Sequence, residues 1–164
     1  MNLVGVDLGT RKVALALFVD SDLASCVAHE AHLMTRDLQL AEVAGFVHDH
    51  VLMFEADSIW IEDTIIGNNR KYSIQLAEIK GAVLATLARV RMIRGTDVRM
   101  VDNKVWKKQV VGNGNATKDM VRDYIDVTHG AYAPLCEGDQ DRYDACCVGL
   151  YGHHVTKQAA TLQL

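Results

Sequence analysis

The sequence predicts an α/β fold in which a five-stranded mixed sheet is flanked by helices. Two observations carry this prediction. Short apolar runs with strand character alternate with longer segments of helical periodicity, and three of those runs come before the first helical segment. The chain has one proline, no repeat and no low-complexity tract. We therefore expect a single domain over residues 1–164, whose last few residues form a loose tail.

The first part of the chain predicts three strands in an antiparallel meander, followed by a helix. The first two strands are joined by the short turn Gly9-Thr10-Arg11. Asp37 directly precedes the helix, in which apolar side chains recur at helical spacing, and is its expected N-cap. The expected strands cover residues 3–8, 12–19 and 25–34, and the helix covers residues 38–54.

The rest of the chain predicts two more strands, each followed by helical segments. Both strands are short and apolar, and the helix between them is the longest in the chain. The expected elements are a buried strand over 57–62, a helix over roughly 70–93, a strand over 97–101, a short helical piece from Asn103, a glycine-rich loop at 112–115, a helix over 117–127 and a last helix from about 140 to 157.

Composition limits the class of protein. The 164 residues are 49% hydrophobic and 23% charged, which is typical of a globular domain. No apolar run approaches the ~20 residues that span a bilayer, and the N-terminus lacks a signal-peptide pattern, so we expect a cytoplasmic protein without a membrane segment. The cysteines do not resemble a disulfide framework, and we expect reduced, mostly buried thiols at Cys26, Cys136, Cys146 and Cys147.

Charge is distributed unevenly along the chain. The net charge is −4, but residues 70–122 contain twelve basic and four acidic side chains, which gives +8 there and −12 elsewhere. Such segregation suits a protein that meets phosphates with one surface and concentrates carboxylates around cations on another. The alternative is that the basic residues merely solvate a long helix.

Four carboxylates stand where this fold would bring them together. Asp7 lies in the first apolar strand and Glu62 ends the fourth, and the ends of these strands can be neighbours in such a sheet. Asp141 and Asp144 are three residues apart at the start of the last helix, so they share one helix face. Carboxylates suit Mg²⁺, and two such ions can stabilise the attacking and leaving oxygens of an in-line displacement.

Some of these acids also have a simpler explanation. An unpaired charge in an apolar strand is costly, so Asp7 either binds a cation or caps the adjacent turn. Carboxylates in the first turn of a helix interact favourably with its dipole, which applies most of all to Asp139. Strand alternation sends the side chains of Glu62 and Asp63 to opposite faces, and we expect Glu62 to face the site.

A glycine-rich loop flanked by lysines predicts a segment that contacts phosphate. The loop is Gly112-Asn113-Gly114-Asn115, whose glycines would let a phosphate backbone approach closely. Lys107, Lys108 and Lys118 supply positive charge on both sides of it. Three histidine pairs have metal-like spacing, but no cysteine stands at zinc-finger spacing from them, which argues against a zinc finger.

Together, these residues resemble the RuvC-type Holliday-junction resolvases of the ribonuclease-H-like superfamily, over most of the chain. The first acidic strand is the least specific similarity, because actin-like ATPases share it. The segment from Val110 to Lys118 and the closing pair Asp141 and Asp144 are specific. The similar segments are Gly5-Val6-Asp7-Leu8-Gly9, then Ile61-Glu62 with Asn69, Leu76-Ala77 and Lys80-Gly81, then Val110-Val111-Gly112-Asn113-Gly114-Asn115-Ala116-Thr117-Lys118, and finally Asp141 with Asp144-Ala145.

The resemblance implies a ribonuclease-H-like fold and a homodimer joined through the helix after Glu62. Each subunit would hold a Mg²⁺-dependent site, with two ions and with Mn²⁺ as a possible substitute, and would nick one of two opposed strands of a four-way DNA junction. One ion would be held by Asp7 and Asp144, the other by Asp7 and Glu62. The implied metal ligands and catalytic residues are Asp7, Glu62, Asp141 and Asp144, and the expected DNA contacts are Lys107, Lys108, Lys118, Asn69, Arg70 and Lys71.

Two departures from the family pattern matter. An aromatic residue three positions after the catalytic Glu is replaced by Ile65, which cannot stack on a base, so we do not expect strict sequence preference at the cut. The loop before the last helix is acidic, and Asp139 is an alternative to Asp141 as the fourth ligand. No residue pattern identifies a branch-migration motor as a partner.

Three alternatives remain at the level of sequence. A YqgF-like nuclease that processes RNA shares the first strand, but lacks the segment at 110–118 and the long helix pattern after Glu62. An actin-like ATPase or sugar kinase needs a second phosphate motif and is usually at least twice this long. A non-catalytic junction-binding protein would not need all four acids.

Overall fold

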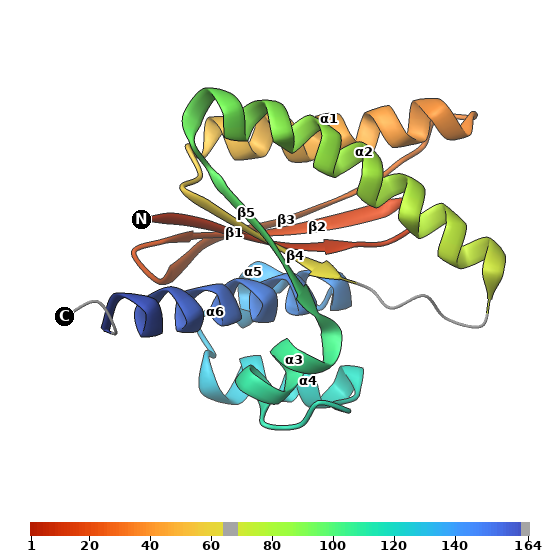
Figure 1. Cartoon of the computed structure of the whole chain (residues 1–164). Coiled ribbons are helices and arrows are strands. Elements are labelled where there is room, and N and C mark those ends of the chain that lie inside the picture. Colours follow the sequence, from red (N-terminus) through yellow and green to blue (C-terminus); the bar gives the residue numbers. More distant parts are fainter. Residues whose placement is uncertain (64–68, 162–164) are drawn as a thin grey trace.

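A computed structural model describes residues 1–63 and 69–161 of the chain. Its centre is a five-stranded sheet with the strand order β3-β2-β1-β4-β5, and helices cover both faces of this sheet (Figure 1). The mixed sheet and the number of strands are those predicted from the sequence. No helix within these two ranges combines the length and the apolar composition that a membrane span requires.

The first three strands form the expected meander. β1 (Asn2–Leu8) pairs antiparallel with β2 (Lys12–Val19), which pairs antiparallel with β3 (Asp22–Glu30). The predicted extent of the third strand, 25–34, is wrong at both ends. The strand ends at Glu30 because the next backbone groups bond elsewhere: Arg11 binds both polar backbone groups of Ala31, and the Glu42 carboxylate accepts from the following two amides.

The helix α1 (Arg36–Met53) begins two residues before its predicted start. Its N-cap is Thr35, in an extended conformation, and Asp37 lies inside the first turn, so the prediction of Asp37 as the cap is wrong. Asp37 still carries a negative charge near the helix N-terminus, where the helix dipole favours it. The cap therefore lies two residues before the predicted one, and Asp37 still interacts favourably with the helix dipole.

Two parallel strands extend the sheet on the other side of β1. β4 (Ser58–Asp63) pairs parallel with β1, and β5 (Asp97–Asp102) pairs parallel with β4. The connection between them contains the long helix α2 (Arg70–Arg94), which lies beside α1 on one face of the sheet (Figure 1). The neighbouring ends of β1 and β4, as expected from the sequence, place Asp7 and Glu62 at the same edge.

The last helix, α6 (Gln140–Thr161), crosses the opposite face and contacts β1, β2, β3 and β4 (Figure 1). The shorter elements on this side contribute to the same core. They are α3 (Asn103–Trp106), the π-helical turn η1 (Lys107–Val111), α4 (Lys118–Thr128) and α5 (Ala133–Cys136), of which α5 was not predicted.

Strand alternation divides the interior into two cores. Val4, Val6 and Ile61 belong to the core beneath α1 and α2, whereas Leu3 and Trp60 belong to the core beneath α6. Side chains of a strand that are an even number of positions apart point to the same face. Asp7 therefore lies on the same face as Leu3, and Glu62 on the same face as Trp60, which is the α6 side. Periodicity thus sends both acids toward the helix that carries Asp141 and Asp144.

Glycines let α6 approach the sheet closely. A Cβ atom on Gly5 of β1 would lie 2.2 Å from the carbonyl oxygen of Ala145 and 2.5 Å from the amide nitrogen of Gly149. A Cβ atom on Gly149 would lie 2.2 Å from the Phe18 ring. Only residues without a side chain fit between the strand and the helix here, and this contact fixes the height of α6 above Asp7.

Candidate active site

Asp7 is the centre of a group of carboxylates at the ends of β1 and β4. Its side chain is half-buried, and burial raises its pKa well above the usual range. The negative charges of Glu62, Asp144 and Asp141 raise the pKa further, and the Lys118 ammonium opposes them. Within residues 1–63 and 69–161, no hydrogen bond or ion pair reaches this carboxylate, so this half-buried acid has no partner among the described residues.

Glu62 is buried, with 5% of its surface exposed, and both of its oxygen atoms accept hydrogen bonds. The Asn103 amide donates to Oε1 at 2.7 Å, and the Trp106 indole donates to Oε2 at 2.9 Å. These two donors fix the orientation of the carboxylate and offset part of the cost of burying it. Asp63 instead pairs with Lys80 of α2, on the other face, as alternation predicts.

Asp144 lies on the second turn of α6 and is half-buried. The Gln140 amide donates to its Oδ1 at 3.0 Å. Burial raises the pKa of Asp144 to about 6, and the Glu62 charge contributes, whereas the Gln140 hydrogen bond and the charges of Lys107 and Lys118 lower it. Because the charge of Glu62 contributes to this shift, the two carboxylates lie close enough for their charges to interact.

Lys12, which the sequence analysis did not single out, joins the acids that precede and begin α6. Its ammonium lies 2.7 and 2.8 Å from the two oxygens of Asp139 and 2.8 Å from Asp141. Asp139 also accepts from the backbone amide of Asp141, which makes it part of the start of the helix. Of these two acids, only Asp141 is among the charges that raise the pKa of Asp7.

The arrangement suits a hard divalent cation. All donors are carboxylate oxygens, which Mg²⁺ and Mn²⁺ prefer, and the Asp7 carboxylate has no hydrogen-bond or ion-pair partner among the described residues. In the described part of the chain, no three carboxylates have oxygens all within 4.8 Å of one another. Repulsion between the negative charges favours carboxylates that are farther apart than this, and bound cations would relieve the repulsion.

Two of the expected DNA-contacting lysines lie beside the acids. Lys107 and Lys118 both act electrostatically on Asp144, and Lys107 also lies over the Trp106 ring, with 5.4 Å between its ammonium and the ring centre. Lys118 is the first residue of α4, where Thr117 is the N-cap. Lys108 is exposed and has no ion pair with a described residue.

The other expected DNA contacts lie at the start of α2. The Asn69 side chain is the N-cap of this helix and accepts from the Tyr72 amide at 3.1 Å. Arg70 and Lys71 line a groove of about 500 Å³ together with Arg36. Arg36 donates to the carbonyl of Thr10, so the groove lies near the end of β1 that carries Asp7. Ile65 lies outside the described residues.

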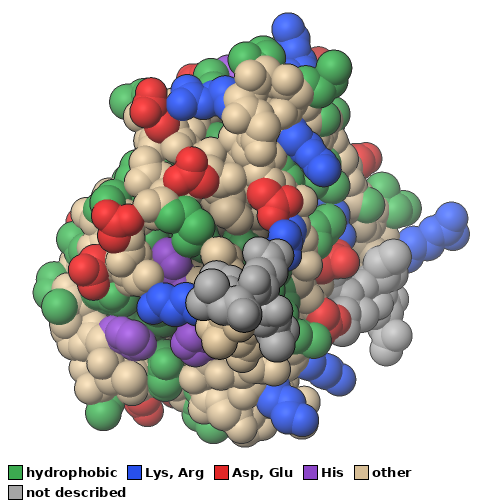
Figure 2. All heavy atoms as spheres, turned by 60° about the vertical axis from the view of Figure 1, so that its left-hand side comes forward, with side chains coloured by type: hydrophobic (Ala, Val, Ile, Leu, Met, Phe, Trp, Pro, Cys, Tyr) green, Lys and Arg blue, Asp and Glu red, His purple; other side chains and the backbone are tan. Residues whose placement is uncertain are grey.

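The basic segment does not form one continuous surface. Lys107 and Lys118 lie near the acids, whereas Arg89 lines a groove between α1 and α2 and Arg94, at the far end of α2, pairs with Glu55. On the face shown in Figure 2, acidic and basic side chains are interspersed. The basic residues that cluster in the sequence are therefore distributed over several separate parts of the fold.

Sequence patterns did not reveal the pairing of Lys12 with Asp139 and Asp141, nor the two donors to Glu62, and the reasons differ. Lys12 opens an apolar strand, where a charged first residue is unremarkable, and its partners are more than 120 residues away. Asn103 begins a short helix, and its position directly after the end of β5, beside β4, was a usable signal. Trp106 offered no signal, since an aromatic residue in such a segment is usually core.

Comparison with known proteins identifies the family. The family model described as crossover junction endodeoxyribonuclease RuvC matches residues 3–129, a range that contains Asp7, Glu62, Lys107 and Lys118 and ends before α6. RuvC of Neorickettsia sennetsu is 33% identical over 152 residues, covering 87% of this chain and 86% of the relative. RuvC of Helicobacter acinonychis is 32% identical over 129 residues, covering 74% and 77%.

Solved structures agree with this assignment. Thermus thermophilus RuvC superposes with a TM-score of 0.75 at 16% identity, covering 97% of both chains. The same protein in complex with a Holliday junction substrate gives a TM-score of 0.74 at 16% identity, covering 92% of this chain and 91% of the other. The ribonuclease-H-like fold and the family resemblance predicted from the sequence are thereby confirmed. The chain belongs to the RuvC family of crossover junction endodeoxyribonucleases.

Proposed function

We propose that this chain hydrolyses phosphodiester bonds in four-way DNA junctions, as a homodimer that nicks two opposed strands and depends on Mg²⁺ or Mn²⁺. The observation that supports this most is the set of acids around Asp7. The pKa of Asp7 is raised by the charges of Glu62 on β4 and of Asp141 and Asp144 on α6. Lys107 and Lys118 lie beside these acids. Family membership supplies the reaction class.

Asp7, Glu62, Asp141 and Asp144 would hold the cations. Bound there, divalent ions supply an activated water and stabilise the charge that develops on the phosphate. Asn103 and Trp106 orient Glu62 by donating to its two oxygens, and Lys12 holds Asp141 at the start of α6. Because the charge of Asp141 is among the largest that raise the pKa of Asp7, we take Asp141 as the fourth ligand in preference to Asp139.

The lysines would position the DNA backbone. Lys107 and Lys118 lie on the α6 side next to the acids, where a scissile phosphate must sit, and a lysine acts there as a point charge. Lys108, exposed beside them, would contact the backbone further along. Arg70 and Lys71 would contact a second stretch of DNA from the other side of the same sheet edge.

The proposed dimer would form through α2. This helix exposes Ile74, Met92 and Ile93, with exposed fractions of 49%, 87% and 80%. Ile93 lines a groove of about 600 Å³ between α1 and α2, whose other lining residues include several alanines and a glycine. Exposed apolar side chains beside a groove are a common feature of interaction surfaces.

The direct test is incubation of purified protein with a labelled, immobile four-way DNA junction, in Mg²⁺ and in EDTA, followed by denaturing electrophoresis. We expect paired, symmetric nicks in Mg²⁺ only. Asp7→Asn and Glu62→Gln should bind the junction and cut it at least about 1,000-fold more slowly, since each removes a charge from the proposed metal site. Wild-type cutting by either variant would contradict the assignment.

A matched pair of variants tests the fourth ligand in the same assay. Asp141→Asn should slow cutting by about 100-fold or more, whereas Asp139→Asn should retain most activity. The opposite result would assign the ligand to Asp139. A junction that is bound but left uncut by the wild-type protein would instead favour a non-catalytic binding protein.

A further inference from the structure

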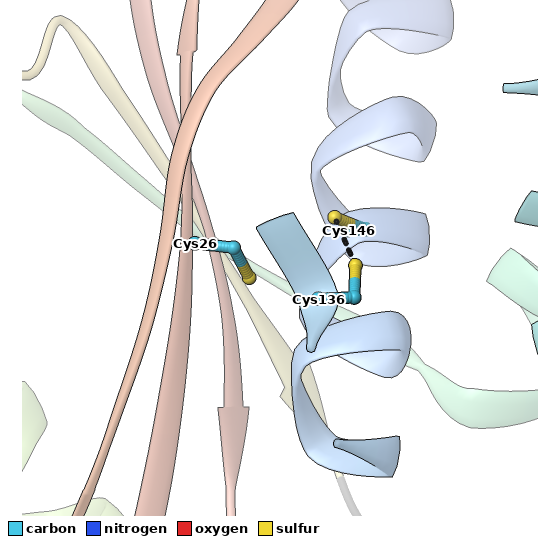
Figure 3. Close-up of side chains that lie close together, drawn as sticks. All are labelled: Cys26, Cys136 and Cys146. Atoms are coloured by element: carbon cyan, nitrogen blue, oxygen red, sulfur yellow. Dashed lines mark hydrogen bonds between the residues drawn. The ribbon is translucent and has the colours of Figure 1, made fainter. Parts of the chain in front are cut away.

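Three cysteines that are far apart in the sequence converge beneath α6. Cys26 comes from β3, Cys136 from the end of α5 and Cys146 from α6, and their sulfur atoms all lie within 4.8 Å of one another (Figure 3). The Sγ atoms of Cys136 and Cys146 are 3.6 Å apart. All three residues are buried, with exposed fractions of 6%, 0% and 0%.

The spacing of these sulfur atoms is close to that of a metal–thiolate site. Zinc–sulfur bonds of about 2.3 Å at tetrahedral angles place neighbouring sulfurs about 3.8 Å apart. The Cys136–Cys146 separation already matches this value, and Cys26 needs only a small movement to meet it. Within the described part of the chain, no fourth Cys, His, Asp or Glu ligand atom joins the group.

The surroundings can compensate the charge of thiolates. Hydrogen bonds from Cys146 and Cys26 lower the pKa of Cys136, and the guanidinium of Arg142 lowers it further, whereas the hydrogen bond to Cys136 and burial raise the pKa of both Cys26 and Cys146 in the absence of a metal. The Arg142 Nε atom is buried and has no hydrogen-bond partner among the described residues, although another nitrogen of the same group pairs with Glu137 at 2.6 Å. An arginine close to the thiols thus retains an unused donor.

We propose that Cys26, Cys136 and Cys146 bind one thiophilic divalent cation of the Zn²⁺ class as three thiolates, with release of the thiol protons to solvent. Soft thiolate ligands select such ions over Mg²⁺, so this site and the carboxylates need not compete for one metal. Three thiolates and a divalent ion carry a net charge of −1, which Arg142, itself paired with the exposed Glu137, offsets in part. A monovalent ion would leave −2 in a buried site, which is less favourable.

The ion would join three elements of the fold. It would link β3, α5 and α6 near the N-terminal end of α6, two residues after Asp144. Metal binding of this kind adds to the free energy of folding, because the unfolded chain lacks a preformed site. This inference does not depend on the proposed nuclease function, since it concerns other residues and another class of ion.

The test uses the full chain, reduced and stripped of metal, then refolded without oxygen in excess Mg²⁺ with Cd²⁺ or Zn²⁺ and desalted. Metal per chain is measured by mass spectrometry, and Cd²⁺–thiolate bonds by their ultraviolet charge-transfer absorption. We expect one ion per chain, with an absorption equivalent to three thiolates. At saturation the melting temperature should rise by about 5–10 °C.

Cys147 provides a matched control. It is fully buried, it follows Cys146 on the same helix, and it does not belong to the cluster. Cys147→Ala should bind one ion as the wild type does, whereas Cys26→Ala and Cys146→Ala should bind at least about 100-fold more weakly. Cys26, at the edge of the core, is the variant least expected to prevent folding.

Several outcomes would overturn the proposal. They are retention of no ion by the folded wild type, equal binding by the cluster variants and the wild type, absence of thiolate absorption in the Cd²⁺ protein, and loading by Cu⁺ but not by Zn²⁺ or Cd²⁺. The absorption and stoichiometry of the wild type are decisive by themselves, so the test does not depend on a variant that fails to fold.

Discussion

At the scale of single residues, the site centres on two acids, Asp7 and Asp144, that form no ion pair with a described residue. Asp7 lies among three other acids and has no donor in the part of the chain that the structure describes, and Asp144 has a pKa raised to about 6. Natural proteins accept such local instability where function requires it, and they recover it elsewhere in the fold. Both acids should therefore cost stability when no metal is bound.

This cost has a defined pH dependence. Because the pKa of Asp144 is higher in the folded chain than its unfolded value near 4, the folded state holds the proton more tightly. Its contribution is fully present below about pH 4 and is lost as the pH rises through about 6. In EDTA at pH 7.5, Asp144→Asn should increase the free energy of unfolding by about 2–3 kcal/mol, while abolishing cutting.

Denaturant unfolding at two pH values checks this prediction. The difference between wild type and Asp144→Asn should shrink as the pH falls to 4 and vanish below it, where the wild-type carboxylate becomes protonated in the unfolded state as well as in the folded state. The variant keeps the oxygen that accepts from Gln140, so the change reports mainly on charge. A variant no more stable than the wild type at pH 7.5 would show that the site is not under electrostatic strain.

Trp106 positions Glu62 by donating a hydrogen bond to it, and this role can be tested separately from its contribution to packing. Trp106→Phe removes the donor to Glu62 Oε2 and should lower the free energy of unfolding by about 1–3 kcal/mol. Cutting should fall about 10- to 100-fold, with partial recovery at high Mg²⁺, since partners of metal ligands typically act on affinity by that factor. Activity is measured as a function of Mg²⁺ concentration.

Trp60 supplies the control for this substitution. Its indole nitrogen is buried and has no hydrogen-bond partner among the described residues. Trp60→Phe removes a similar volume without removing a hydrogen bond to an acid, so the Mg²⁺ dependence of cutting should be unchanged. Equal Mg²⁺ profiles for the two variants would mean that Trp106 acts only by packing.

At the scale of elements, the decisive contact is that of α6 on β1. Gly5→Ala would place a Cβ atom 2.2 Å from backbone that cannot rotate away, so α6 must move and carry Asp141 and Asp144 with it. We expect a loss of about 3 kcal/mol in unfolding free energy. Cutting should fall even at temperatures where the variant remains folded.

Gly45 in α1 is the matched control. A Cβ atom there meets nothing within 4 Å, so Gly45→Ala should raise the free energy of unfolding by about 0.5–1 kcal/mol through helix propensity. The stabilities of both variants are compared by denaturant unfolding, and cutting by Gly5→Ala is measured in the junction assay. A Gly5→Ala protein of wild-type stability and activity would refute the close-contact explanation.

At the scale of the whole molecule, the two faces of the sheet have different proposed roles. The α6 face carries the acids and lysines, and the α1–α2 face carries the exposed apolar side chains of the proposed dimer. A protein that nicks two opposed strands needs two sites, which one chain does not supply. The oligomeric state therefore tests the proposed function as a whole.

Light scattering after gel filtration checks the dimer. The wild type should have the mass of two chains, and the double variant Ile74→Asp with Ile93→Asp should have the mass of one, because buried unpaired charges oppose association. Its junction products should then be single rather than paired nicks. Val127→Asp, at a site 85% exposed on α4, should remain a dimer, and a dimeric double variant would exclude α2 as the interface.

Much of this fold could be predicted because its signals are local. Apolar periodicity gave the order of the strands and of the longer helices, and the i, i+3 spacing of Asp141 and Asp144 placed them together on α6. The errors were also local: Thr35 rather than Asp37 caps α1, and side chains from elsewhere end β3 early. Helix and strand ends depend on such partners, which periodicity does not reveal.

The sequence by itself determined the element order, the faces on which the acids lie and the resemblance to the family. Only the tertiary structure decided that Lys12 joins Asp139 and Asp141, that Trp106 holds Glu62 and that Cys26 meets Cys136 and Cys146. The physical reason is sequence separation. These contacts link residues tens to more than a hundred positions apart, and they exist only because α3 and α6 dock on one face of the sheet, at a height that Gly5 and Gly149 set.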